Sequence, residues 1–150
     1  MRGSVMGTAV TLAAGALLTA AMTTASANPP ATAAKADTPR PVLVDCFWRQ
    51  NVRPADFILA CGDGNSRLAG LRWSQWSPDE ATATGVNLVN DCKPNCAAGR
   101  FHGYPVTVRL DEPRPWKKNP GVQHYTRMSL TYEDARPEGF QQVMTYPLWN

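Results

Sequence analysis

The sequence has few of the features that catalytic, nucleic-acid-binding or membrane-spanning proteins need. Histidine occurs twice in 150 residues, and the mature chain lacks the Gly-x-Ser-x-Gly motif that presents a nucleophilic serine in many hydrolases. Basic residues exceed acidic ones by three and are spread along the chain, so no basic patch for a phosphate backbone is visible. We therefore assign no catalytic residue, no cofactor and no nucleic-acid partner.

A long apolar run is also missing, and the N-terminus has the pattern of a secretion signal. Arg2 is followed by an uncharged, mostly apolar stretch from Val10 to Ala21 and by the small residues Ala25-Ser26-Ala27. The stretch is rich in Thr, Gly and Ala, whereas crossing a membrane takes roughly 20 strongly apolar residues. The pattern predicts a signal peptide over residues 1–27 and release without a stable membrane anchor. The first cysteine, Cys46, is too distant from the cleavage site to carry a lipid.

The expected mature chain is nearly neutral and begins with a tether. Loss of Arg2 leaves 14 basic against 12 acidic side chains, a formal charge of +2. Residues 28–41 consist mainly of Ala, Pro and Thr, which cannot bury enough apolar surface to offset the entropy of ordering. We predict a disordered tether over 28–41 and a single β-rich domain over 42–150, a span of 109 residues.

The four cysteines of this domain predict two disulfides, because exported small domains are commonly tied by such bonds. Three pairings are possible among Cys46, Cys61, Cys92 and Cys96. We favour Cys46 with Cys61, across the turn-prone segment Asn51 to Pro54, and Cys92 with Cys96, across Lys93-Pro94-Asn95. Zinc held by the second pair and His102 is the alternative. Structural zinc sites usually show two close ligand pairs, and here one pair is close.

Alternating apolar and polar residues predict an antiparallel all-β sandwich or barrel. Val106, Val108 and Leu110 share one face of a strand, and a second strand alternates in the same way over 124–132. Other strands are expected at 42–48, 56–61, 68–76 and 141–146. Residues 77–90 are ambiguous between one short helix opening at Pro78 and a further strand. The three prolines and one glycine of 111–121 predict a loop.

The segment Gly62-Asp63-Gly64-Asn65 predicts a turn between two strands, since glycine and asparagine tolerate positive φ. Its acidic and amide residues also suggest a calcium loop. The residues that follow, Ser66, Arg67 and Leu68, lack the ligands and the terminal glutamate of such loops, so we interpret the segment as a turn and predict no metal.

Trp73-Ser74-Gln75-Trp76-Ser77 resembles the Trp-Ser-x-Trp-Ser box of cytokine-receptor fibronectin domains and part of thrombospondin repeats. The resemblance implies tryptophans stacked with arginines. In a regular strand, residues three apart point to opposite faces, which places Trp73 in the core and Trp76 outside. Exposed aromatic residues anchor protein partners or stack on sugars. The predicted binding surface consists of Arg72, Trp76, Arg109 and Arg127.

A wider pattern covers nearly the whole mature domain. It comprises Cys46, Arg53-Pro54, Cys61-Gly62-Asp63-Gly64-Asn65, Leu71-x-Trp73-x-x-Trp76, Asn90-Asp91-Cys92-x-Pro94-x-Cys96 and Tyr104-Pro105-Val106. This pattern resembles a family of small secreted actinobacterial proteins without an assigned activity. The resemblance implies export and a shared fold, and it transfers no catalytic residue.

The chain also resembles the secreted subtilisin-inhibitor family in its mature size, its two expected disulfides and its β-sheet content. That family closes its reactive-loop disulfide with a cysteine far downstream, whereas here no cysteine follows Cys96. We therefore expect an extracellular, non-catalytic binding module for a protein or carbohydrate. A protease inhibitor with residues 92–101 as its loop, and a small secreted hydrolase, are the alternatives.

Overall fold

The computed structural model describes residues 40–150, which form an antiparallel all-β fold. The predicted signal peptide and most of the predicted tether lie outside the described residues. Eight strands are present: β1 (Leu43–Val44), β2 (Gln50–Asn51), β3 (Phe57–Ile58), β4 (Ser66–Trp76), β5 (Ala81–Asn90), β6 (Phe101–Trp116), β7 (Asn119–Tyr132) and β8 (Val143–Pro147). Residues 40–150 contain no helix, and so none that could span a membrane.

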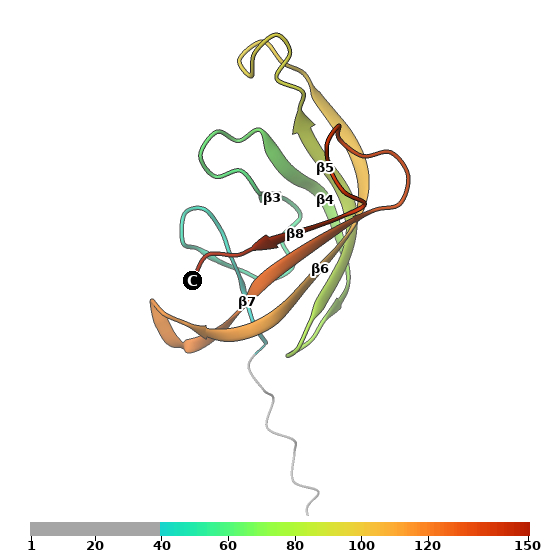
Figure 1. The fold of residues 1–150 in the computed structure, drawn as a ribbon. Coiled ribbons are helices and arrows are strands. Elements are labelled where there is room, and N and C mark those ends of the chain that lie inside the picture. Colours follow the sequence, from blue (N-terminus) through green and yellow to red (C-terminus); the bar gives the residue numbers. More distant parts are fainter. Residues whose placement is uncertain (1–39) are drawn as a thin grey trace, which may run out of the picture. The chain divides into compact units, whose positions relative to one another are not determined.

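Six strands form one sheet in the order β3-β4-β5-β6-β7-β8, each antiparallel to the next, and β1 and β2 form a separate two-stranded ribbon. The large sheet curls into a half-barrel, with the segment that carries β1, β2 and β3 on its concave side (Figure 1). The curled sheet and two disulfides confirm the predicted all-β, disulfide-tied class.

The central strands follow the predicted two-residue alternation. Val108 of β6 pairs with Leu130 of β7, and both side chains are buried. The neighbouring pair, Arg109 and Ser129, points away from the core. The ambiguous segment 77–90 resolves into a tight turn followed by β5. In that turn the Ser77 N–H donates to the Glu80 carbonyl oxygen (2.9 Å), so the short helix that the sequence allowed at Pro78 does not form.

The loop predicted over 111–121 is wrong, because β6 and β7 continue through it as one long hairpin. Pro113 and Pro115 lie in β6 opposite Tyr125 and Gln123. The pairing with β5 ends at Leu110, so this part of β6 has β7 as its one strand neighbour in the sheet. On the side of β6 that faced β5 there are no inter-strand hydrogen bonds beyond Leu110, so a proline removes none there. The chain turns back at Lys117 and Lys118.

Two β-bulges in β4 change the direction of its side chains. The register with β5 shifts between Ala69 and Arg72 and again between Trp73 and Gln75. At the first bulge Gly70 has a φ of 61°, a conformation that favours glycine. Gly85 on β5 lies opposite, where an added Cβ would come within 2.8 Å of the Leu71 side chain. A side chain at either position would therefore disturb the bulge.

Because of the second bulge, Trp73 and Trp76 both turn toward the core, although three residues separate them. Their rings meet edge to face, with centroids 4.6 Å apart. Trp76 is 4% exposed, and its Nε1–H donates to the Pro41 carbonyl oxygen at 2.9 Å. The prediction of an outward Trp76 is therefore wrong, since it assumed an uninterrupted strand.

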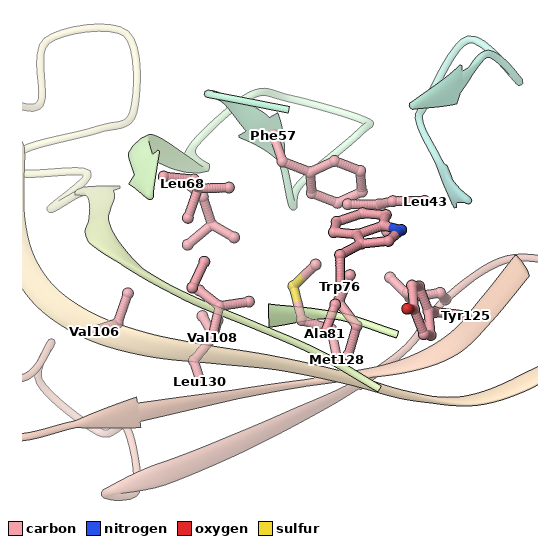
Figure 2. Close-up of a cluster of buried hydrophobic side chains, with 14 of the residues drawn as sticks. Leu43, Phe57, Leu68, Trp76, Ala81, Val106, Val108, Tyr125, Met128 and Leu130 are labelled. Atoms are coloured by element: carbon pink, nitrogen blue, oxygen red, sulfur yellow. The ribbon is translucent and has the colours of Figure 1, made fainter. Parts of the chain in front are cut away.

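The hydrophobic core lies between the concave face and the N-terminal segment. Figure 2 shows Leu43 of β1 and Phe57 of β3 next to the Trp76 indole, with Met128 and Tyr125 beneath it. These side chains form one cluster of buried residues with the inward positions of β5, β6 and β7. The sheet alone would leave this face exposed, so the segment before it completes the core.

The N-terminal segment is attached to β7 by backbone hydrogen bonds. The Val42 N–H donates to the Gln123 carbonyl oxygen (2.9 Å), and the Tyr125 N–H donates to the Val42 carbonyl oxygen (3.1 Å). Pro41, the last residue of the predicted tether, is fully buried. The domain therefore begins at least one residue earlier than its predicted boundary.

His124 is buried beneath this attachment. Its Nδ1 lies 2.9 Å from the Arg114 carbonyl oxygen and must donate, since a carbonyl only accepts. Its Nε2 is buried and has no hydrogen-bond partner within residues 40–150. Loss of hydration lowers the pKa of His124 below 6.5, and this effect outweighs the opposing hydrogen bond to Arg114.

Replacing Trp76 with alanine should lower the free energy of unfolding by about 3–5 kcal/mol, because the large buried ring leaves a cavity in the core. Trp48→Ala, at a position 43% exposed, is the matched control and should cost far less. Urea unfolding followed by circular dichroism measures both. Equal losses for the two variants would contradict the buried position of Trp76.

The stability of the domain should fall as pH decreases below about 6.5, because the unfolded chain takes up a proton on His124 before the folded chain does. The stability continues to fall until the pH reaches the pKa of His124 in the folded state, which is below 6.5. Unfolding free energies between pH 7.5 and 5.5 measure the slope, which should be reduced in His124→Gln and retained in His102→Gln. An unchanged slope in His124→Gln would contradict the assignment.

Candidate functional site

The structure separates Trp76 from the three arginines of the predicted binding surface. Trp76 belongs to the core, whereas Arg72, Arg109 and Arg127 are on the outer side of the sheet. The cation–π contacts within residues 40–150 are made on Phe47, Trp48 and Phe101, and the arginine ladder that the Trp-Ser-x-Trp-Ser resemblance implied is not formed there.

Arg109 and Arg127 are paired with acidic side chains. Arg109 donates to Glu80 through Nε (3.1 Å) and Nη2 (2.9 Å), and its Nη1 lies 2.6 Å from Asp111. Arg127 donates to both carboxylate oxygens of Asp111, at 2.6 and 3.0 Å, and also contacts Glu112. The hydrogen bond to Glu80 raises the pKa of Arg109, and that to Asp111 raises the pKa of Arg127. Both guanidinium groups are therefore paired with carboxylates within the domain.

Exposed apolar side chains gather instead in the loop that the first disulfide closes. Residues 40–150 expose six large apolar side chains, and four of them, Phe47 (65%), Val52 (59%), Trp48 (43%) and Ile58 (37%), lie between Cys46 and Cys61. We call residues 46–61 the aromatic loop. Scattered single exposures are common on proteins, whereas here four of the six fall within one disulfide-closed loop.

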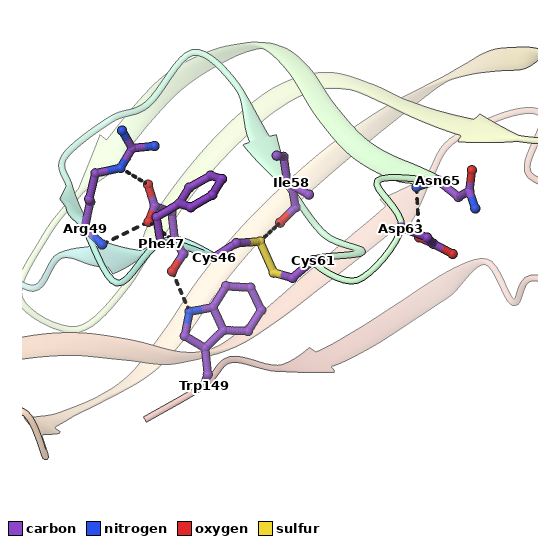
Figure 3. The surroundings of a disulfide bond; sticks show 9 residues. Cys46, Phe47, Arg49, Ile58, Cys61, Asp63, Asn65 and Trp149 are labelled. Carbon is purple, nitrogen blue, oxygen red and sulfur yellow. Dashed lines mark hydrogen bonds and ion pairs between the residues drawn. A yellow bond between two sulfur atoms is a disulfide. The ribbon is translucent and has the colours of Figure 1, made fainter. Parts of the chain in front are cut away.

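Both disulfides have the pairing that the sequence favoured, Cys46 with Cys61 and Cys92 with Cys96. The first closes a separation of 15 residues, for which the chain-entropy model gives about 3 kcal/mol of stabilisation. Figure 3 shows Trp149 from the C-terminus beside this disulfide. The Trp149 Nε1–H donates to the Asp45 carbonyl oxygen at 3.0 Å, which fixes the start of the aromatic loop to the other end of the chain.

Asp45 shapes the turn that presents Phe47 and Trp48. Its Oδ1 accepts from the N–H groups of Phe47 and Arg49, both at 2.9 Å, and its Oδ2 accepts from the Arg49 Nε at 3.0 Å (Figure 3). Desolvation would raise the pKa of Asp45, but these hydrogen bonds outweigh it and lower the pKa. An ionised carboxylate therefore organises the turn above acidic pH.

Trp48 has a backbone conformation that is unfavourable for a bulky residue. Its φ is 61°, in the left-handed region where glycine or asparagine is usual. Arg53, at the other end of β2, has a φ of 51°. Side chains with a Cβ cost roughly 1–2 kcal/mol in this region. The surrounding loop therefore has to hold this tryptophan in a strained backbone conformation.

Basic groups surround the exposed rings. The Arg49 guanidinium lies 4.9 Å from the centre of the Phe47 ring, and the Lys118 Nζ lies 3.6 Å from that of Trp48. Lys118 comes from the turn between β6 and β7, so the extended hairpin brings its cation to the aromatic loop. Each of these two rings therefore has a cation against it, and the Arg49 cation is also paired with Asp45.

A hollow of about 240 Å³ lies beside Phe47 and Ile58, with Phe57 also in its lining. Asp45 and Asp56 contribute carboxylates to the lining, and Asp56 accepts a hydrogen bond from the Gly70 N–H at 3.3 Å. The hollow therefore adjoins Phe47 and Ile58, two of the four exposed apolar side chains of the aromatic loop.

The second disulfide belongs to a loop of a different kind. Residues 91–100 join β5 to β6 through successive turns, and the Ala98 N–H donates to the Asn95 carbonyl oxygen at 3.2 Å. The alternative of a protease inhibitor with residues 92–101 as its loop stays a prediction.

Phe47, Val52 and Ile58 were missed by the sequence analysis. The expected strands 42–48 and 56–61 contain Phe47 and Ile58, and Val52 lies in the turn-prone segment 51–54. None of these segments alternates regularly enough to predict which side chains are exposed. The available signal was the adjacent pair Phe47-Trp48 between an expected disulfide cysteine and the turn-prone residues 51–54. No protein-family model matches the chain, and the comparisons with curated proteins and with solved structures found no match.

Trp48→Gly should be more stable than Trp48→Ala by about 1 kcal/mol, because both variants lose the indole but glycine alone tolerates the positive φ. Chemical denaturation of the two variants under one condition measures the difference. Glycine and alanine replacements of Thr131, which lies in the regularly paired part of β7, provide the reference for an extended position, where alanine should be the more stable. An Ala variant of Trp48 that equals or exceeds the Gly variant would contradict the strained turn.

Proposed function

We propose that this chain is an exported, non-catalytic binding protein that uses the aromatic loop to bind an extracellular protein. The observation that carries the proposal is the exposure of Phe47, Trp48, Val52 and Ile58 within one disulfide-closed loop. Aromatic side chains at the centre of an interface supply much of the binding energy when a partner removes them from water.

The aromatic loop is held in shape before any partner arrives. The Cys46–Cys61 disulfide, the Asp45 turn and the Trp149 hydrogen bond each restrain it. A preorganised loop loses little conformational entropy on binding, so more of the interaction energy appears as affinity. The same restraints support the strained Trp48 backbone, which a flexible loop would relax.

Charge and shape favour a protein partner with acidic groups around its contact. Arg49 and Lys118 lie against the exposed rings. Asp45 is engaged by hydrogen bonds that include Arg49, and Asp56 accepts from the Gly70 N–H. The hollow beside Phe47 would receive one side chain of the partner. An anionic lipid surface would also attract the cations, but it would make no use of a hollow.

Export is consistent with the two disulfides, which form and persist in oxidising compartments. The signal pattern of residues 1–27 supports the same location. We propose on these grounds that the domain works outside the cell.

The test uses the purified exported protein as bait for the extracellular proteins of the cells that produce it, followed by measurement of Kd for each retained protein. Phe47→Ala should weaken binding at least tenfold, because it removes a 65%-exposed ring from the contact. Phe101→Ala is the matched control. Phe101 is 46% exposed and also lies against a guanidinium, that of Arg67 at 5.5 Å, but it is outside the aromatic loop.

Equal losses for Phe47→Ala and Phe101→Ala would refute the aromatic loop as the contact. Anionic phospholipid vesicles provide the second arm. Sedimentation with these vesicles that depends on Phe47, without a protein retained in the first arm, would assign the surface to lipid and refute a protein partner. Binding of a protein that weakens with added salt would support the acidic contact.

A further inference from the structure

A second concave region, separate from the aromatic loop, lies between the end of β5, the start of β6 and the loop that joins β7 to β8. This cleft has a volume of about 480 Å³, within the range of roughly 300–1,000 Å³ found for small-molecule sites. It shares no lining residue with the hollow beside Phe47. The cleft is therefore a distinct candidate site.

Half-buried aromatic rings form part of the cleft lining. Tyr104 and Phe140 both line it, and each packs edge to face against Tyr132, with ring centroids 6.5 and 6.2 Å apart. Tyr132 is 1% exposed, and its hydroxyl oxygen accepts from the Asn87 Nδ2 at 2.7 Å. A buried, hydrogen-bonded ring thus holds two partly exposed rings in place, which preorganises an apolar contact surface.

The polar side of the cleft is also fixed. Asp91 accepts from the N–H groups of Lys93 (3.1 Å) and Arg100 (2.9 Å) through Oδ1, and its Oδ2 lies 2.9 Å from the His102 Nε2. The hydrogen bond from Arg100, followed by that from His102, lowers the pKa of Asp91 to about 2. A carboxylate only accepts, so the His102 Nε2–H donates to Asp91. The His102 side chain is 50% exposed and accessible from solvent.

A solvent-exposed ion pair joins the loops on either side. Lys93 Nζ, from the Cys92–Cys96 loop, lies 3.3 Å from Glu138 Oε2, from the loop between β7 and β8. The two side chains are 73% and 91% exposed, and such pairs contribute little to stability. Both groups can therefore exchange this contact for hydrogen bonds to a ligand.

We propose that this cleft is a binding site for a short neutral oligosaccharide. Tyr104 and Phe140 would contact the C–H face of a sugar ring, while His102, Lys93 and Glu138 would hydrogen-bond its hydroxyl groups. The lining holds both donors and acceptors and charges of both signs, which suits a neutral ligand with many hydroxyl groups better than a strongly charged one. The assignment is independent of the protein contact proposed for the aromatic loop.

The test is a titration of the ¹⁵N-labelled exported protein with soluble trisaccharides of glucose, xylose and N-acetylglucosamine, followed by NMR, with trigalacturonic acid as the charged comparison. At least one neutral sugar should bind, with shifts at His102 and Tyr104. Tyr104→Ala should weaken this binding at least tenfold. Tyr146→Ala replaces a half-buried tyrosine outside the cleft and should leave the affinity unchanged, as should Phe47→Ala.

If Tyr104→Ala does not fold, His102→Ala and Glu138→Ala test the proposal instead. Both side chains are substantially exposed, so we expect these two variants to fold. Each should weaken binding without changing the unfolding midpoint. The proposal is overturned if no neutral trisaccharide binds at millimolar concentration, if trigalacturonic acid alone binds, or if the shifts fall on the aromatic loop. It is also overturned if His102→Ala and Glu138→Ala both bind as the unmodified protein does.

Discussion

The structure depends on the burial of the concave face of the half-barrel by the chain that precedes it. Trp76 is the central contact, since its ring packs against Leu43, Phe57 and Tyr125 while its Nε1–H reaches the carbonyl oxygen of Pro41. An open curled sheet has no second layer of its own, so this contact provides the missing half of the core. The attachment of Val42 to β7 and the burial of His124 both follow from it.

The arrangement also explains where binding surfaces remain. The N-terminal segment has to cross the concave face, and it does so with short strands and turns that cannot bury every apolar side chain. The apolar side chains that stay exposed lie in the aromatic loop, which the Cys46–Cys61 disulfide and the Trp149 hydrogen bond hold in place. The cleft lies where the outer loops of the sheet meet, around Asp91 and Glu138. The two surfaces therefore come from different parts of the fold and can serve different ligands.

Sequence reasoning succeeded where regular patterns decide the outcome. The alternation around Val108 and Leu130 predicted two paired strands, and cysteine spacing across turn-forming residues predicted both disulfides. It failed where one irregular residue changes the pattern. A bulge after Trp73 reverses the direction of Trp76, and the end of β5 at Leu110 allows β6 to continue through prolines that otherwise indicate a loop.

The amino-acid sequence by itself predicted the paired strands around Val108 and Leu130 and favoured the two cysteine pairs that form. Both depend on local patterns, since alternation is read from residues two apart and each cysteine pair spans a turn-forming segment. Tertiary structure alone decided which tryptophan is exposed, that Arg109 and Arg127 share Asp111, and that Tyr104, Phe140 and His102 line one cleft. These outcomes depend on strand register and on which distant segment covers which face. Register is set by the whole sheet, and a shift of one residue moves every later side chain to the other side.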